Sequence, residues 1–314
     1  MRLLRGISFY QPFIQGSVVT IGNFDGVHLG HQALLTQLRR QAQRLNLPSV
    51  VILFEPQPGE YLHPQTAPAR LSTLREKLAR VKELGIDYVY CLRFNQSLAT
   101  LTAEDFARTY FFTQLSMRYL LVGEDFRFGY KRQGDIHLLR QMAEEQDCTV
   151  ETIQDFTAEG ARVSSTRIRH LLAKADLHGA SRLLGRTYSL CGRVSRGEGR
   201  GRQWGIPTAN LSGRRANLPL QGVFCVRVQR QNGQLLEGVA NLGRRPTVDG
   251  SKVVLEVHLF NFNGNLYGEF LQVFFLHKLR DEKKFSSIGE LIAQIQNDID
   301  AAKAAFRLSA FKLT

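Results

Sequence analysis

The sequence predicts two domains, a doubly wound parallel α/β sheet followed by a small antiparallel β-barrel with a C-terminal helix. Over residues 1–185, short apolar β-branched runs alternate with amphipathic helical patterns, as in a parallel sheet with crossover helices. After residue 185 the runs are short and alternating, and turn dipeptides such as Asn232-Gly233 and Asn263-Gly264 separate them. We therefore expect one domain over 1–185 and a second over 186–314.

The first domain opens with SVVTIGNFDGVHLGHQALL at residues 17–35. A buried strand at 18–21 breaks at Gly22 and Gly26, and a helical pattern begins at His31. Ligands of parallel sheets bind at the carboxyl ends of the strands, so we expect a site there. Further strands are expected at 49–54, 87–92, 119–122 and 149–153. Helices are expected at 72–84, with Ser72 as the cap, after Thr102, and at 136–145. A proline-rich loop is expected at 55–64.

The remaining chain changes from helical to strand patterns. Residues 164–166 are capping residues for a helix, and Asp176 and Gly179 indicate a break before a short helix at 180–184. The strands are expected in YSLCGRV, GVFCVRVQ, LLEGVANL, KVVLEVHLF and FLQVFFLHKL. A helix with one apolar stripe is expected at 287–307.

The composition is that of a globular chain with a basic balance. Its 314 residues carry a formal net charge of +13, which suits anionic nucleotides, and no nucleic-acid motif accompanies it. No run of about 18 apolar residues occurs, so we expect no membrane segment. The four cysteines lack metal-ligand spacing, which predicts reduced thiols in the cytoplasm. We expect small-molecule substrates and no nucleic-acid partner, and leave self-association into a homo-oligomer open.

Two histidines stand where the first strand meets its helix. His28 and His31, in HLGH, would lie beside a helix N-terminus, whose free N–H groups attract phosphate. Imidazoles there add hydrogen-bond donors, and positive charge when protonated, where phosphoryl chemistry builds up negative charge. The alternative is a polar turn with two solvated histidines.

A second polar helix start occurs in SSTRIR at residues 164–169. The hydroxyls of Ser164, Ser165 and Thr166, with the free N–H groups of the helix start, suit a phosphate. Arg169 can reach back to a triphosphate. An ordinary N-cap is the alternative.

The segment GRVSRGEGRGRQWGIPTANL at 192–211 joins a glycine-rich loop to two oxygen ligands. Gly197, Gly199 and Gly201 would let backbone N–H groups approach phosphates, with a flexible turn as the alternative. The hydroxyl of Thr208 and the amide oxygen of Asn210 can ligate Mg²⁺ carried by ATP.

Glu256 is the only acid in the strand expected at 252–260. Its carboxylate can take the proton from an attacking hydroxyl. An outward-facing strand residue is the alternative, and the residues alone leave both readings open.

The HxGH and SSTxxR pair resembles that of the nucleotidylyltransferase superfamily. With FEPQP, APARLSTLREKL and VGEDFRFGYKRQGD, it resembles the FMN adenylyltransferase module of the bacterial bifunctional riboflavin kinase/FAD synthetase family. The resemblance implies a Rossmann-like domain in which an FMN phosphate oxygen attacks the α-phosphorus of ATP and pyrophosphate leaves. It implies that His28 and His31 stabilise the transferring phosphates and that Arg169 pairs with the β/γ-phosphates. Asn23 and Asp125 match positions that contact nucleotide or flavin.

The second half resembles the flavokinase domain of the same family, through PTAN, NLGRRPT, LEVHLF, NLYG and LRDEKKFSSIGEL. This resemblance implies that Thr208 and Asn210 bind magnesium and ATP, and that Glu256 is the base that activates the ribityl 5′-hydroxyl of riboflavin. The expected activities are phosphorylation of riboflavin to FMN, with ADP released, and adenylylation of FMN to FAD. Mg²⁺ is the expected cofactor, ATP the co-substrate, and riboflavin, FMN and FAD are the substrates and products.

Two residues depart from the family pattern. Gln57 stands where the family has a histidine, and Trp204 stands where a leucine is usual. Three alternatives are a chain that keeps one activity and uses the other domain for binding, a non-enzymatic flavin or nucleic-acid binder, and a different nucleotidylyltransferase. The last would leave PTAN and Glu256 unexplained.

Overall fold

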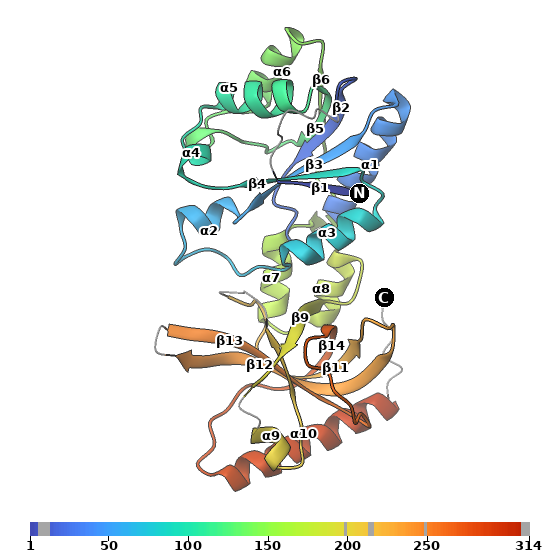
Figure 1. Cartoon of the computed structure of the whole chain (residues 1–314), viewed down its shortest axis with the longest axis vertical. Coiled ribbons are helices and arrows are strands. Elements are labelled where there is room, and N and C mark those ends of the chain that lie inside the picture. Colours follow the sequence, from blue (N-terminus) through green and yellow to red (C-terminus); the bar gives the residue numbers. More distant parts are fainter. Residues whose placement is uncertain (6–12, 198–199, 213–216, 248–249, 309–314) are drawn as a thin grey trace. The chain divides into compact units, whose positions relative to one another are not determined.

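The computed structural model describes residues 1–5, 13–197, 200–212, 217–247 and 250–308 (Figure 1). The chain divides into two compact units, one of Met1–Pro68 and Ser72–Ser164, the other of Ala69–Leu71 and Ser165–Thr314. The helices that follow Ser164 therefore group with the barrel, and a domain boundary at residue 185 stays a prediction. None of the described helices is long and apolar enough to cross a bilayer.

The first unit is built on a six-stranded sheet in the order β1-β4-β3-β2-β5-β6, and its strand pairs are parallel. The strands are β1 (Arg2–Leu4), β2 (Ser17–Ile21), β3 (Ser49–Glu55), β4 (Tyr88–Arg93), β5 (Met117–Gly123) and β6 (Thr149–Ile153), with a separate antiparallel hairpin of β7 (Thr157–Ala158) and β8 (Ala161–Arg162). The helices are α1 (Leu29–Leu45), α2 (Pro58–Leu62), α3 (Leu74–Glu83), α4 (Gln96–Ala99), α5 (Ala103–Phe106), the π-helix η1 (Ala107–Gln114), the 3₁₀ turn η2 (Tyr130–Arg132) and α6 (Ile136–Glu144).

Helices cover both faces of this sheet, as the sequence predicts. Successive strand residues point to opposite faces. Val18 and Val51 pack with α1 and α3, whereas Val19 and Val50 pack with α5, η1 and α6. This alternation confirms the doubly wound parallel sheet.

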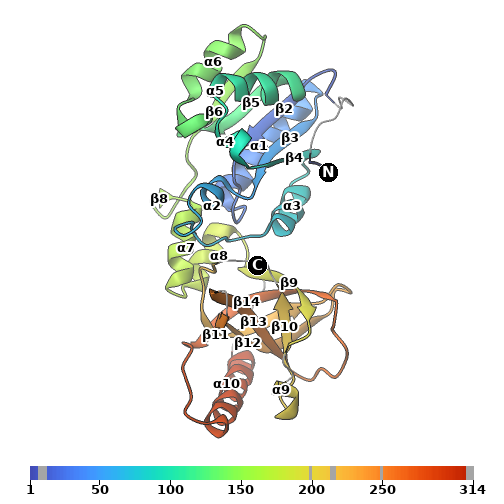
Figure 2. The same cartoon turned by 60° about the vertical axis from the view of Figure 1, so that its left-hand side comes forward.

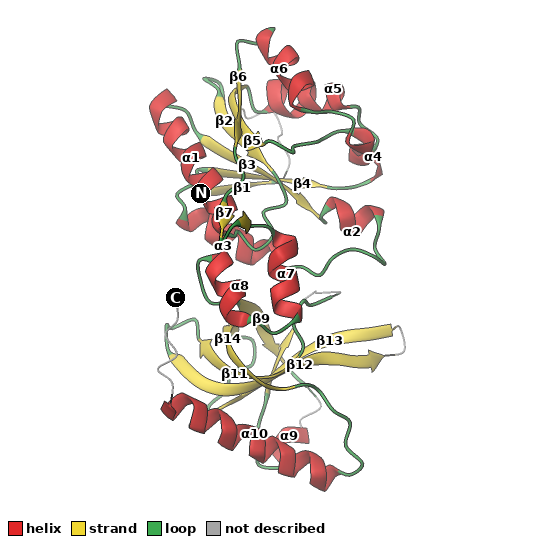
Figure 3. Cartoon of the chain, turned by 180° about the vertical axis from the view of Figure 1, so that it is seen from behind, coloured by secondary structure: helices red, strands yellow, loops and turns green. Residues whose placement is uncertain are grey.

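The second unit is a closed antiparallel barrel in the order β10-β13-β12-β11-β14-β9, with helices before and after it (Figure 2). Its C-terminal helix packs against β11, β12 and β14, and its first two helices lie against each other (Figure 3). The elements are α7 (Ser165–Ala173), α8 (Leu177–Leu184), β9 (Ser189–Ser195), α9 (Arg200–Gln203), β10 (Ala209–Ser212), β11 (Gly222–Gln229), β12 (Leu235–Thr247), β13 (Gly250–Leu259), β14 (Phe270–Arg280) and α10 (Ile288–Leu308).

Thr73, not Ser72, caps α3. The Thr73 hydroxyl accepts the Glu76 N–H, and the Glu76 carboxylate accepts the Thr73 N–H at 2.6 Å, which completes a capping box. The Ser72 hydroxyl instead donates to Asp25 and accepts the Gly26 N–H at 2.9 Å. The predicted cap is wrong because Ser72 is committed to the turn that follows β2.

Other elements differ from the sequence prediction because of local interactions that hydrophobic periodicity does not reveal. The proline-rich loop contains α2, because a proline in the first helical turn needs no N–H partner. The first helix begins at Leu29 rather than His31, and α8 begins at Leu177 because Asp176 caps it. Strand β1 and the β7–β8 hairpin were not predicted, since two or three residues carry too little periodicity.

We expect Thr73→Ala to lower the free energy of unfolding by about 1 kcal/mol, because the helix start loses its hydroxyl acceptor. Thr73→Ser keeps that acceptor and is the matched control. Urea unfolding followed by circular dichroism measures both variants. Equal stability of the alanine and serine variants would contradict the cap.

Candidate active sites

The turn between β2 and α1 holds the histidine pair of the first unit. Phe24, Gly26 and Val27 have φ angles of 46°, 83° and 41°, a conformation that costs energy in non-glycine residues and is often found at functional sites. His28 then caps α1, its Nδ1 accepting the His31 N–H at 3.3 Å. An accepting Nδ1 carries no proton, so the proton of the His28 ring lies on Nε2.

The two imidazoles stack, with ring centroids 3.6 Å apart and planes inclined by 17°. Burial lowers the pKa of His31 well below its usual range, and the nearby His28 and Lys77 lower that pKa further. The buried Nδ1 of His31 has no hydrogen-bond partner among the described residues. His31 is therefore neutral near pH 7 and offers a phosphate hydrogen bonding rather than positive charge.

A buried lysine supports this turn from α3. Lys77 is 1% exposed, and its ammonium donates to the Asn23 carbonyl at 2.8 Å. Lys77 is not among the site residues predicted from the sequence, although its spacing from Leu74 and Val81 puts it on the apolar stripe of α3. A charged residue in such a stripe is the signal that could have identified it. A role of the Asn23 side chain in ligand binding stays a prediction.

Asp125 follows β5 and is engaged by a residue that the sequence analysis did not identify. Arg162 of the β7–β8 hairpin donates to Asp125 at 2.9 Å, and this hydrogen bond lowers the pKa of the carboxyl. The same guanidinium lies 2.9 Å from Asp155, which follows β6. Arg162 therefore links the ends of β5 and β6 to the hairpin. A contact of Asp125 with nucleotide or flavin stays a prediction.

The hydroxyl-rich segment is divided between the units. Ser164 ends the first unit, whereas Ser165, Thr166 and Arg169 lie on α7 in the second. Arg169 Nε donates to the Ala69 carbonyl at 2.6 Å, within the second unit. Cooperation of this segment with the histidine pair stays a prediction.

The barrel unit contains a cavity of about 320 Å³. Gly201, Thr208, Asn210 and Glu256 line it, as does Trp204, one of the two departures from the family pattern. The other departure, Gln57, is buried at the start of α2 in the first unit, where its N–H donates to Glu60 at 3.0 Å. Gly199 lies outside the described residues.

Gly197 makes room for the Asn210 side chain. A Cβ atom at Gly197 would lie 2.4 Å from the Asn210 amide nitrogen, so any larger residue would displace that amide. The glycine is needed here for close approach of a side chain. Direct contact of the Gly197 backbone with phosphate stays a prediction.

Three polar side chains share one rung of the barrel. Asn210 on β10 pairs with Glu256 on β13, and Glu256 pairs with Asn241 on β12. Neighbouring strands lie about 4.8 Å apart, so these side chains line the cavity side by side. Asn241 is missing from the sequence-based site, because only the register shows that it flanks Glu256. Its Oδ1 is buried and has no hydrogen-bond partner within the described ranges.

The oxygen atoms of this cavity fit Mg²⁺. A hydroxyl, amide oxygens and a carboxylate are hard ligands of the kind that Mg²⁺ prefers, and the unpartnered Asn241 oxygen adds an acceptor. In the described part of the chain, no group of three or more His, Cys, Asp or Glu could hold a metal. Few protein ligands are expected when the ion arrives with the phosphates of ATP.

The first unit has a parallel sheet with histidines at a strand–helix turn, and the second has a barrel with a carboxylate-lined cavity. These features are those of a phosphate-transferring enzyme. Two family models match the chain, FAD synthetase over residues 11–167 and riboflavin kinase over residues 184–306. Bifunctional riboflavin kinase/FMN adenylyltransferases are similar over the whole length. The Haemophilus influenzae protein is 44% identical over 306 residues (98% of this chain, 99% of that protein), and the Pseudomonas fluorescens protein 47% over 313 (99% and 100%).

The chain belongs to the bifunctional riboflavin kinase/FMN adenylyltransferase family. It phosphorylates riboflavin to FMN and adenylylates FMN to FAD, with ATP as co-substrate. A crystal structure described as a macrolide-efflux protein from Streptococcus pneumoniae has a similar fold. Its TM-score is 0.75 and its identity 31%, over 92% of this chain and 94% of that one.

The lowered pKa of His31 predicts a loss of stability in acid. Below pH ~6.5 the unfolded chain binds a proton at this residue and the folded chain does not, so the free energy of unfolding falls with decreasing pH. The loss is at most about 1.4 kcal/mol per pH unit. We expect wild type to lose stability relative to His31→Gln between pH 7.5 and 5.5, measured by urea unfolding. Parallel pH dependences of the two proteins would contradict a neutral His31 in the folded chain.

Proposed function

We propose that the barrel cavity catalyses the riboflavin kinase step and that the β2–α1 turn catalyses the FMN adenylyltransferase step. The observation that carries this division is the shared rung of Asn210, Glu256 and Asn241 in the cavity wall. It supports a carboxylate base that can take the proton of an attacking hydroxyl, with an amide side chain on each side. The first unit has the histidines and no comparable rung among its described strands.

In the kinase step, the Glu256 carboxylate accepts the proton of the ribityl 5′-hydroxyl. The hydroxyl oxygen bonds to the γ-phosphorus of ATP, while the bond from that phosphorus to the departing ADP oxygen breaks. Thr208 and Asn210 hold ATP together with Mg²⁺, which neutralises phosphate charge when bound. Gly197 leaves room for the Asn210 side chain, and Gly201 leaves room for the Ile206 carbonyl.

In the adenylyltransferase step, a phosphate oxygen of FMN bonds to the α-phosphorus of ATP, and the bond to pyrophosphate breaks. No side-chain nucleophile is needed, because the substrate phosphate attacks directly. His28 and His31 donate hydrogen bonds where charge develops. The sequence resemblance assigns the pairing with the β/γ-phosphates to Arg169, and further donors to the hydroxyls of residues 164–166.

The cellular setting follows from the same chemistry. The free thiols Cys91, Cys148, Cys191 and Cys225 support a reducing, cytoplasmic location. Two ATP sites and an anionic FMN site account for the net charge of +13 without nucleic acid. Self-association stays open.

We expect Glu256→Gln to lower FMN formation from riboflavin by 10²- to 10⁴-fold, because the base is lost. FAD formation from added FMN should stay at the wild-type rate. Chromatography of the three flavins after incubation with Mg-ATP measures both steps. A folded variant in which both rates fall together would contradict the division between units.

The reciprocal variant is His28→Asn, which keeps an N-cap acceptor for α1. FAD formation from FMN should fall at least tenfold, because a hydrogen-bond donor to the phosphates is lost. FMN formation from riboflavin should not change, and the same chromatography tests this. Wild-type FAD formation would exclude the assigned role of His28.

A further inference from the structure

The loop that joins β14 to α10 forms one wall of the barrel cavity. Glu282, Lys283 and Phe285 of this loop line the cavity, together with Leu291 and Ile295 of α10. At this loop end, Phe285, Leu291 and Ile295 supply apolar surface beside the charged Glu282 and Lys283. Thr208, Asn210 and Glu256 form a polar set in the same cavity. A flat apolar ring system fits the loop end, and phosphates fit the polar set.

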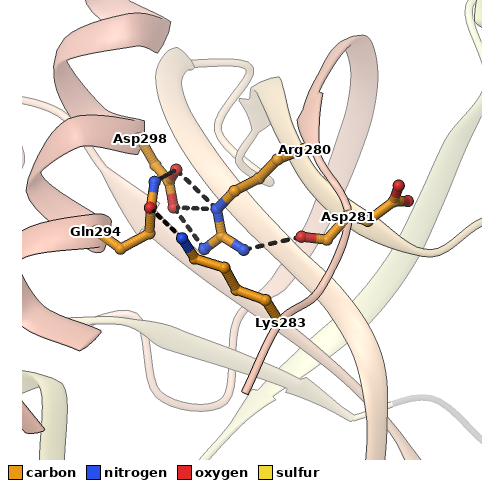
Figure 4. A network of polar contacts seen from close by, with 5 residues as sticks. All are labelled: Arg280, Asp281, Lys283, Gln294 and Asp298. Atoms are coloured by element: carbon orange, nitrogen blue, oxygen red, sulfur yellow. Dashed lines mark hydrogen bonds and ion pairs between the residues drawn. The ribbon is translucent and has the colours of Figure 1, made fainter. Parts of the chain in front are cut away.

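A buried ion pair anchors the start of the loop (Figure 4). Arg280, at the end of β14, donates to both carboxylate oxygens of Asp298 on α10, with distances of 2.7 to 3.1 Å. Asp298 is only 5% exposed, Arg280 is half-buried, and both residues line the cavity. The remaining Nη1 of Arg280 donates to the Asp281 carbonyl at 2.9 Å, which fixes the first loop residue.

Gln294 connects this ion pair to the middle of the loop. Its Nε2 donates to Asp298 at 2.9 Å, and its Oε1 accepts from the Lys283 ammonium at 2.7 Å (Figure 4). Gln294 lies on α10 and does not line the cavity. Its hydrogen bonds within the described residues connect it to two residues that do line the cavity, Lys283 and Asp298.

Two further contacts hold the rest of the loop. Arg280 and Lys283 lie over the Phe285 ring, 5.8 and 5.2 Å from its centroid. The Ser286 hydroxyl and N–H donate to the Glu290 carboxylate at 2.8 and 3.2 Å. The loop is thus tied to its neighbours at its beginning, middle and end.

We propose that Gln294 is a positioning residue for the kinase reaction: by joining Lys283 to the Arg280–Asp298 pair, it fixes the loop wall against which the flavin ring binds. This rests on the proposed assignment of the kinase step to the barrel cavity. The tether holds the loop in its binding conformation before riboflavin arrives, so riboflavin does not have to order it. Losing the tether weakens riboflavin binding and leaves the groups at the reacting atoms in place.

The test is Gln294→Met, which keeps the side-chain length and removes both hydrogen bonds. Gln296→Met is the matched control, because Gln296 lies on the same helix and bonds only to Asp300 among the described contacts. We expect the KM for riboflavin to rise about three- to tenfold in Gln294→Met, as for one or two lost hydrogen bonds, with kcat within twofold of wild type. Gln296→Met and the conversion of added FMN to FAD should be unaffected.

A second variant, Lys283→Met, breaks the same tether from the loop side and keeps the proposal testable if Gln294→Met does not fold. Its KM for riboflavin should rise, and the double variant should be no worse than the more severe single variant. An unchanged KM, a loss confined to kcat, or additive effects in the double variant would overturn the proposal. Glu256→Gln is measured in the same assay. If that variant forms FMN at the wild-type rate, the assignment of the kinase step to the barrel cavity is wrong, and this outcome is distinct from a failure of the Gln294 proposal.

Discussion

A charge buried in a protein must be paired with groups that stay in place, and each unit of this chain uses one such charge to fix a loop of its site. In the first unit, Lys77 holds the carbonyl of Asn23 in the strained turn before the histidines. In the second, Asp298 and Arg280 fix the loop that lines the cavity. Each loop would lose one of its anchors without these charges, whereas the sheet and the barrel would still have their apolar cores.

The two units place their polar groups by different geometric rules. In the parallel sheet, the strands end at a common edge. His28 follows β2 and Asp125 follows β5, so both residues lie at the edge where their strands end. In the antiparallel barrel, the strand register determines which side chains are neighbours, and it places Glu256 between Asn210 and Asn241.

Periodicity predicted both folds and most elements, because apolar spacing depends on burial alone. It placed His28 and Glu256 correctly on a strand–helix turn and a strand. It could not identify residues whose role depends on pairing, such as Asn241 beside Glu256 or Arg162 between two aspartates. The cap at Ser72 was wrong for the same reason, since a hydroxyl that can cap a helix can equally bind a distant turn.

One chain transfers a γ-phosphoryl group and then an adenylyl group to the same flavin. Incubation of the protein with riboflavin, Mg²⁺ and ATP labelled at either phosphorus tests it directly. The γ-label should appear in FMN and then in FAD, whereas the α-label should appear in FAD and never in FMN. Label from the α-phosphorus in FMN, or FAD without the γ-label, would contradict the account.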